Sequence, residues 1–309
     1  MSTGLFTHPS CLLHEMGFGH PECPDRLKAV LGELQKPDYA ALLRFEAPAS
    51  TIAQIARVHE RDYVEEILKH VPQQGYAQLD PDTALAPHSG EAALHAAGAV
   101  IAAFDQIMKG KIKNAFCAVR PPGHHAEQAT AMGFCFFNNI AIGAAYTLAT
   151  YNLKRIAIVD FDVHHGNGTE EWAKKHPEIL FCSSHQFPFY PGTGYAEDHG
   201  TFNNIINVPL PAGSGGPAFR HAMENFILPK IGNFAPELIL VSAGFDAHRD
   251  DPLANLRLTE DDFGWITAEL CGLAARLCKG RLISTLEGGY DLAALAQSAG
   301  AHVKALLAA

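Results

Sequence analysis

The segment 158–168, IVDFDVHHGNG, places two aspartates and two histidines at the end of the apolar run 155–159. Such a run is typical of a strand buried on both faces, where a charged group is costly unless it is paired. Asp162 and His164 are two positions apart, so in an extended segment both point to one side and can bind one ion. With Asp246 of SAGFDAH as a third ligand, open positions remain on a zinc ion for water and substrate, as in catalytic sites. For Asp162 and His164 alone, a hydrogen-bonded core pair is the alternative.

A second polar cluster, RPPGHH, contains two consecutive histidines after a rigid Pro-Pro-Gly corner. His124 and His125 can both line a cavity while the second nitrogen of each is held by a polar partner. Asp160 and Asn167, which flank the metal ligands, are the predicted partners. Beside a metal site, the pair would supply a base that takes a proton from water and an acid that protonates a leaving amine. The alternative is a solvated polar turn.

Aromatic residues in three further motifs predict a substrate slot. Tyr290 ends LEGGY, where its phenol could donate to a developing oxyanion and Gly289 would let the backbone approach a ligand closely. Phe134 in GFCFF and Tyr190 in FPFYPGTG could line a narrow apolar slot for a slim alkyl chain. Ordinary packing is the alternative for each of these aromatic side chains.

The elements that must position these residues are apolar runs that alternate with helix-like stretches. The predicted strands are 114–120, 155–162, 178–184, 205–210, 237–246 and 281–289, and the predicted helices are 89–110, 138–152, 217–234 and 259–278. Thr259 and Asp262 form a predicted cap for the last of these helices. This alternation indicates an α/β fold with a mainly parallel sheet between helices, and no linker divides the single domain expected over 1–309. The polar clusters should therefore meet at the carboxyl ends of the strands.

Charge and cysteine usage narrow the class of protein. The chain has 23 Lys and Arg residues and 33 Asp and Glu residues, so its net charge is −10. Because it has no basic run, direct nucleic-acid binding is not expected, and the negative charge favours a cationic partner. Seven cysteines without a CxxC pair indicate reduced thiols. The N-terminal residues lack a secretory pattern, and no apolar stretch reaches membrane-spanning length. We therefore expect a cytoplasmic protein that does not enter membranes.

Taken in order, the motifs resemble the zinc-dependent histone deacetylase family, which has the arginase–deacetylase fold. They are RPPGHHA, GFCFFNN, DFDVHHGNGT, YPGTG, SAGFDAHRDDPL and LEGGY, and the similarity runs from GHPECPDRL (19–27) to Tyr290. The Asn of HHGNG and the Glu of LEGGY are similar to the class II branch and its bacterial relatives. The resemblance implies a three-layer α/β/α fold and hydrolysis of the amide of N-acetyl-lysine to a free amine and acetate.

The resemblance also implies a role for each residue of the site. One zinc ion per chain would be bound by Asp162, His164 and Asp246. His125 would act as general base and then as acid, while His124, paired with Asp160, would tune the electrostatics. Tyr290 would hydrogen-bond the carbonyl oxygen. Arg26 resembles the buried arginine at the inner end of the channel, where acetate can leave.

A substrate channel and bound potassium are further implications of the resemblance. The residues that resemble the channel lining are Gly133, Phe134, Tyr190, Leu253 and Gly289. A structural potassium ion would be bound, partly through backbone carbonyls, by Asp160, Asp162, His164, Ser183 and Ser184. A second, more remote potassium site maps near Ala173, His176 and Ile179.

The substrate stays open between an acetyl-lysine protein or peptide and a small N-acyl amide such as an acetylated polyamine. Leu253 stands where the polyamine-selective eukaryotic relative has a glutamate. Asp82 could grip a substrate at the rim or be a solvated loop charge. A non-catalytic acyl-lysine binder ranks lower because every proposed catalytic group is present. An arginase-like dinuclear manganese hydrolase also ranks lower, since no matching histidine accompanies Asp250 and Asp251. A homo-oligomeric assembly is also compatible with the sequence.

Overall fold

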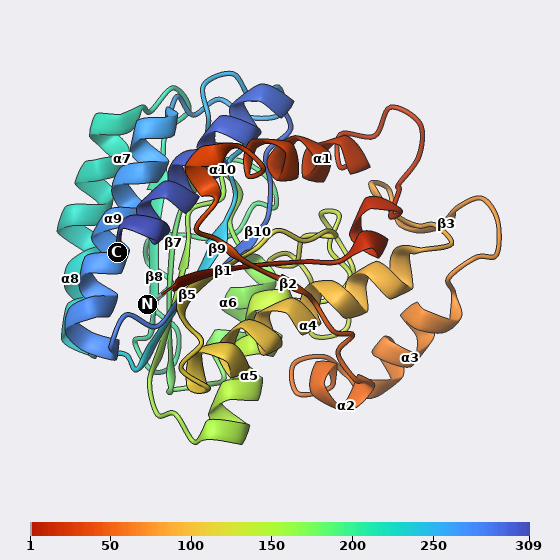
Figure 1. Ribbon diagram of the computed structural model, residues 1–309, viewed down its shortest axis with the longest axis horizontal. Coiled ribbons are helices and arrows are strands. Elements are labelled where there is room, and N and C mark those ends of the chain that lie inside the picture. The colour runs from red at the N-terminus through yellow and green to blue at the C-terminus, as the bar shows by residue number, and fades with distance from the viewer. Residues whose placement is uncertain (1) are drawn as a thin grey trace.

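A sheet of eight parallel strands runs through the centre of the computed structural model, which describes residues 2–309 (Figure 1). Its strands are β1 (Ser2–Thr7), β2 (Leu43–Glu46), β5 (Ile112–Cys117), β6 (Ile156–Asp160), β7 (Ile179–Gln186), β8 (Ile205–Leu210), β9 (Leu238–Ala243) and β10 (Leu282–Leu286). Their order in the sheet is β2-β1-β5-β10-β9-β6-β7-β8, and every neighbouring pair is parallel. A separate antiparallel pair consists of β3 (Ala77–Asp80) and β4 (Thr83–Leu85).

Helices cover both faces of this sheet. They are α1 (Pro24–Glu33), α2 (Ile52–Ile55), α3 (Arg61–Lys69), α4 (Ser89–Met108), α5 (Asn139–Tyr151), α6 (Asn167–Ala173), α7 (Gly216–Ala222), α8 (Leu228–Phe234), α9 (Glu260–Cys278) and α10 (Leu292–Ala308). Short 3₁₀ turns are η1 (Pro9–Leu12) and η2 (Pro37–Tyr39). Helices α1, α9 and α10 pack together on one face, and α4 and α5 pack together on the other (Figure 1). The predicted α/β fold with a mainly parallel sheet between helices is confirmed.

The central strands are buried along their whole length and mainly apolar in their first halves, because helices exclude water from both of their faces. Every residue of β6, β7, β9 and β10 is buried. The polar side chains that the sequence places after these strands therefore begin where the helical cover ends. The side chains that could take part in a reaction therefore lie at the carboxyl edge of the sheet, and the rest of the sheet contributes to the packed core.

The predicted helix 217–234 is confirmed, but its hydrogen-bond pattern changes in the middle. It consists of α7, a π-helical turn at Met223–Ile227 and α8. Pro229 lies in the first turn of α8, where its missing N–H removes a donor from the regular helical ladder. The regular hydrogen-bond pattern therefore restarts at Leu228 rather than running through.

The predicted cap of α9 is confirmed. Asp262 Oδ2 accepts hydrogen bonds from Thr259 N at 3.0 Å and from Thr259 Oγ1 at 3.2 Å. The Thr259 side chain in turn accepts from the backbone of the third helical residue, so the two residues form a reciprocal capping box.

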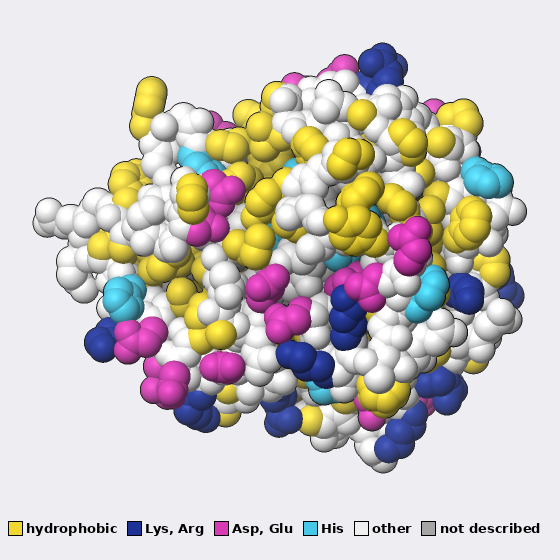
Figure 2. All heavy atoms as spheres, turned by 180° about the vertical axis from the view of Figure 1, so that it is seen from behind, with side chains coloured by type: hydrophobic (Ala, Val, Ile, Leu, Met, Phe, Trp, Pro, Cys, Tyr) yellow, Lys and Arg dark blue, Asp and Glu magenta, His cyan; other side chains and the backbone are white. Residues whose placement is uncertain are grey.

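The outer surface carries both signs of charge. On the face shown in Figure 2, Lys and Arg side chains lie among Asp and Glu side chains rather than in one patch. Within residues 2–309, none of the helices is long and apolar enough to cross a membrane.

Candidate active site

Four neighbouring strands end in the polar clusters that the sequence singles out. The turn with His124 and His125 follows β5, Asp162 follows β6, Asp246 follows β9 and Tyr290 follows β10. In the sheet these strands are adjacent, in the order β5-β10-β9-β6. Because parallel strands present their carboxyl ends at one edge, clusters that are far apart in the chain come together there.

The proposed zinc ligands Asp162, His164 and Asp246 form one compact group. One ligand atom of each lies within 4.8 Å of the others. His164 Nδ1 is 3.0 Å from Asp162 Oδ1 and 3.2 Å from Asp246 Oδ2. Both aspartates are buried, and His164 is nearly so. Two carboxylates and one imidazole are a donor set that zinc accepts in catalytic sites.

The surroundings of this group fit a bound cation. Asp246 Oδ2 is buried and receives no well-directed hydrogen bond from residues 2–309, since the His164 ring is engaged by Asp162. Two glycines form a cradle at the carboxylates: a Cβ on Gly244 would lie 1.9 Å from Asp162 Oδ2, and one on Gly288 would lie 2.0 Å from Asp246 Oδ2. Any larger residue at these two positions would push into the carboxylates.

Electrostatics of the group also favour a positive charge. Burial opposes the charged form of His164, yet its contacts with Asp162 and Asp246 raise its pKa to about 10. Burial and the nearby Asp162 raise the pKa of Asp246. A bound cation would take the place of the proton on His164 and let both carboxylates ionise.

The two histidines of the RPPGHH turn have different partners, as predicted. His124 Nδ1 lies 2.9 Å from Asp160 Oδ2, and His125 Nδ1 lies 2.7 Å from Asn167 Oδ1. The amide nitrogen of Asn167 donates to Glu127 Oε1 at 2.8 Å, so its oxygen faces His125 and accepts from Nδ1–H. Nε2 of His125 therefore carries the lone pair that a base needs.

These partners push the two imidazoles apart in proton affinity. Burial opposes charge on His124, but Asp160 and Asp162 raise its pKa to about 10. Burial and the charge on His124 hold the pKa of His125 well below its ordinary value. Two adjacent titratable groups with opposite shifts are the usual sign of separate roles in acid–base chemistry.

A cavity of about 220 Å³ leads to this group. Its walls include the predicted lining residues Gly133, Phe134, Tyr190 and Leu253, together with Asp82, Phe189, Gly288 and Tyr290. Tyr190 and Leu253 stand exposed at the mouth. Gly289, predicted to line the channel, instead points its carbonyl at Arg26 Nε, 2.5 Å away, and Gly288 takes its place in the wall.

Gly133 is required by a close approach. Its φ is +55°, and a Cβ there would lie 2.4 Å from His125 Cδ2. The glycine thus lets the backbone of the channel wall press against the His125 ring. The ring is also bordered by Tyr190, whose centroid is 5.2 Å away at an angle of 83°.

Buried charges behind the site were not assigned from the sequence, apart from Arg26. Glu22 is fully buried and binds Arg120 Nη2 at 2.6 Å and Arg26 Nη1 at 2.9 Å. The guanidinium of Arg26 lies 4.8 Å from the centroid of the Tyr290 ring. Arg120 carries a local signal, since it is a charged residue at the end of the apolar run 114–119, whereas Glu22 has none.

Two acidic residues that were given no catalytic part hold the turns of the site together. Glu287 Oε2 accepts from the backbone N–H of Gly123 at 2.7 Å and of His124 at 3.2 Å. Asp251 accepts from the backbone N–H of Leu253 at 3.0 Å and of Tyr290 at 2.7 Å. Asp251 therefore fixes the channel mouth, a use that differs from the second metal ion of an arginase-like site.

Residues of the two predicted potassium sites differ in their surroundings. Ser183 pairs with Asp160 across β6 and β7, and the neighbouring Ser184 Oγ is buried without a hydrogen-bond partner among residues 2–309. This buried hydroxyl fits a cation, and potassium there stays a prediction. At the remote site, Asn204 Nδ2 donates to three carbonyls, at 2.9, 3.2 and 2.8 Å: those of Ala173, His176 and Ile179. Asn204 Oδ1 is buried without a hydrogen-bond partner among residues 2–309, and a second potassium ion near these carbonyls stays a prediction.

Comparison with known proteins agrees with this geometry. The model of the histone deacetylase domain family matches residues 20–306. The chain belongs to the histone deacetylase family. Family membership makes the chain a deacetylase or amidohydrolase, and it leaves the acyl amide that is cleaved undecided.

Individual members of the histone deacetylase family are similar over most of their length. An uncharacterized protein of Synechocystis is 41% identical over 300 residues, which is 96% of each chain. A histone deacetylase-like amidohydrolase of Pseudomonas aeruginosa is 39% identical over 88% of this chain and 73% of its own. The crystal structure of the HDA15 HD domain superposes with a TM-score of 0.93 at 36% identity, covering 99% of this chain and 88% of that one.

Proposed function

We propose that this chain is a zinc-dependent deacetylase that hydrolyses N-acetyl-lysine in proteins or peptides. The observation that carries the proposal is the pair of imidazoles with opposite pKa shifts beside the group of Asp162, His164 and Asp246. These three residues would hold the zinc ion. When bound, zinc polarises the amide carbonyl and makes a water molecule more acidic.

His125 moves the proton in this scheme. Its Nε2 takes a proton from the attacking water while Nδ1–H stays bound to Asn167. As the C–O bond forms and the C–N bond breaks, the same nitrogen returns that proton to the leaving amine. His124, held charged by Asp160, keeps positive charge next to the reacting atoms.

Tyr290 stabilises the oxygen of the substrate carbonyl. Burial raises the pKa of Tyr290 well above its ordinary value, so its hydroxyl is a donor at neutral pH. A donor aimed at the developing oxyanion is among the largest single contributions to catalysis of acyl transfer. The aromatic walls formed by Phe134 and Tyr190 suit the slim alkyl chain of a lysine.

The direct test is acetate release from an acetyl-lysine peptide by zinc-loaded and chelator-treated protein. We expect release that needs zinc. We expect H125A to abolish turnover at unchanged zinc content, because the base is lost and the ligands remain. H70N, which changes an exposed histidine directly after α3, is the matched control and should keep full activity. Equal turnover by H125A would remove His125 from the mechanism.

A second candidate substrate is an acetylated polyamine, because a carboxylate that could bind a cationic amine lines the cavity. Asp82 lines the cavity, and Asp80 Oδ1 accepts from its backbone N–H at 2.9 Å. Burial, followed by the negative charge of Asp82, raises the pKa of Tyr190, which lines the same cavity. We would compare kcat/KM for acetylspermidine and for a neutral acetyl-lysine peptide. A loss on D82N that is confined to acetylspermidine would favour the polyamine.

A further inference from the structure

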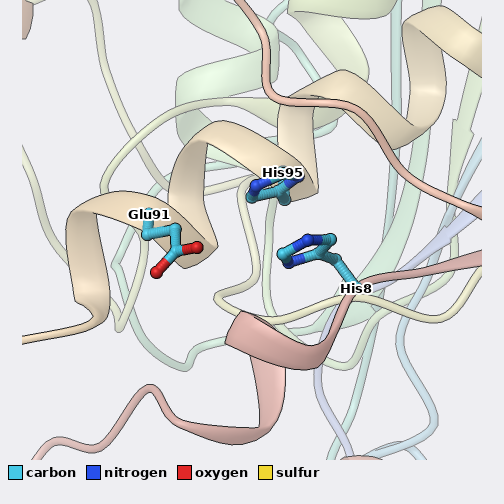
Figure 3. Close-up of side chains that lie close together, drawn as sticks. All are labelled: His8, Glu91 and His95. Atoms are coloured by element: carbon cyan, nitrogen blue, oxygen red, sulfur yellow. The ribbon is translucent and has the colours of Figure 1, made fainter.

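A second cluster of metal-binding side chain types lies away from the active site, beside strands β1 and β2 (Figure 3). His8 directly follows β1, while Glu91 and His95 lie one turn apart on α4. One potential ligand atom of each lies within 4.8 Å of the others. In the sheet, β5, β10 and β9 separate β1 from β6, so this cluster and the candidate active site are distinct.

The hydrogen bonds of His95 leave one of its ring nitrogens free for an ion. Its Nδ1 lies 2.7 Å from the backbone carbonyl of Ala47, which can only accept. Nδ1 therefore carries the hydrogen, and Nε2 has the lone pair. A histidine that binds metal through one nitrogen commonly donates the other N–H to a backbone carbonyl in this way.

His8 can reach the same state through Ser10. Its Nδ1 accepts from the backbone N–H of Ser10 at 3.2 Å and lies 2.7 Å from Ser10 Oγ. If a metal binds Nε2, the hydrogen moves to Nδ1; the ring then gives up the bond from the Ser10 N–H, and the hydroxyl of Ser10 can accept the hydrogen instead.

Two carboxylates are within reach of these rings. Glu91 is exposed, and its nearest charged contact is His88 Nδ1 at 3.9 Å, too far for a hydrogen bond. Glu46, the last residue of β2, places Oε1 3.7 Å from His8 Nε2. Figure 3 shows the Glu91 carboxylate directed toward the two rings.

We propose that His8, Glu91 and His95 form a second site for a divalent transition metal, with zinc as the ion that two imidazoles and a carboxylate suit. Glu46 or water would complete the coordination. The two rings are stacked, with centroids 3.4 Å apart and planes inclined by 3°. Because an ion lies in the plane of each imidazole that binds it, the rings must turn apart for both lone pairs to converge.

An ion at this place would fasten the edge of the sheet to α4. His8 leads into η1, and the carbonyls of Cys11 and His14 that follow accept from Arg120 Nη1 at 2.8 and 3.0 Å. The segment from His8 to His14, whose carbonyls bind Arg120, would thus be held in place at its first residue. The metal is expected to raise stability and to leave the chemistry of the other site unchanged.

Metal stoichiometry tests the proposal. Zinc is titrated into the metal-free protein against a chromogenic chelator, and thermal unfolding is followed at each step. We expect two equivalents per chain in the unmodified protein and in H70N, which removes an exposed histidine that follows α3 and pairs with Glu66. H95F keeps a flat ring against His8 but removes both nitrogens, so it should bind one equivalent and lose the second rise in Tm.

Two more variants make the outcome decisive even if H95F folds poorly. E91Q keeps the shape of the side chain and should weaken the second equivalent by about tenfold or more, the scale of a lost metal-site contact. D246N, altered in the candidate active site, should keep the equivalent that depends on His95. One or two equivalents that remain undiminished in both E91Q and H95F would overturn the proposal, whereas a single equivalent lost in H95F would count against zinc at the candidate active site only.

Discussion

Tyr290 lines the cavity and has its ring against the guanidinium of Arg26. Y290F keeps the ring and the cation–π contact and removes only the donor. We therefore expect kcat to fall by about 10²–10³ while KM and the free energy of unfolding change little. Steady-state kinetics on an acetyl-lysine peptide, together with urea denaturation, would measure this. A fall of less than tenfold would show that the phenol is not the oxyanion donor.

Asn167 determines which nitrogen of His125 is the base. N167L has a similar volume but lacks the oxygen that accepts from Nδ1–H, so turnover should fall by about 10–100-fold at unchanged zinc content. N167D restores an acceptor and should recover part of the rate. Single-turnover rates of the three proteins would be compared. If N167L and N167D are equally impaired, the orientation of the ring is not what Asn167 provides.

Among the loops and turns, the clearest requirement for glycine is at Gly133. Both Gly133 and Gly280 have positive φ, but a Cβ on Gly280 would meet nothing nearer than 3.8 Å. G280A should cost about 1 kcal/mol of stability from backbone strain alone, without an effect on kcat. G133A should cost about 2–4 kcal/mol, since its methyl also overlaps His125, and turnover should fall. Equal effects of the two substitutions on kcat would contradict the close approach.

Several elements could be predicted from the sequence because their signals are local. The buried strands β6 and β9 are continuous apolar runs, and the Thr259 cap is a pattern of four residues. Strand β1 and helix α10 were not predicted. β1 is stabilised by pairing with β5, which lies more than a hundred residues further along the chain. No local sequence pattern predicts such a pairing. The π-helical turn at Met223–Ile227 within the helix 217–234 was not predicted either, although Pro229 was a visible signal.

The site could be predicted where the type of a residue and its position after an apolar strand were enough to indicate its chemical role. His124, His125, Asp162 and His164 stand out as polar residues after apolar strands, and the structure brings them together. Glu22 could not be assigned, because its partner Arg120 is 98 positions away and only the fold joins them. The position of Asn204 among three carbonyls likewise depends on tertiary packing.

For the whole molecule, acid should be destabilising because histidines are buried in the uncharged form. Burial lowers the pKa of His59 to about 4 and that of His302 to about 3. In the unfolded chain both histidines would have a pKa of about 6.5. Their stabilising effect is therefore complete above that pH and is lost as the pH falls toward their pKa values in the folded protein. Each histidine should remove about 1.4 kcal/mol for every pH unit below about 6.

H302Q tests this linkage. The Gln side chain can still reach the hydroxyls of Thr267 and Ser284, which His302 contacts at 2.7 Å each, but it does not titrate. Urea denaturation between pH 7.5 and 5 should give a shallower loss of stability in H302Q than in the unmodified protein. Parallel curves would show that His302 does not take up a proton on unfolding.

The place of β10 in the sheet has a consequence for synthesis of the chain. This strand, at Leu282–Leu286, inserts between β5 and β9, which are both made earlier. Until the ribosome has released those five residues, β5 and β9 each present an unpaired edge that could join another chain. The same insertion delivers Tyr290. When β10 inserts, late in synthesis, the nascent chain therefore pairs its two exposed strand edges and completes its candidate active site in the same step.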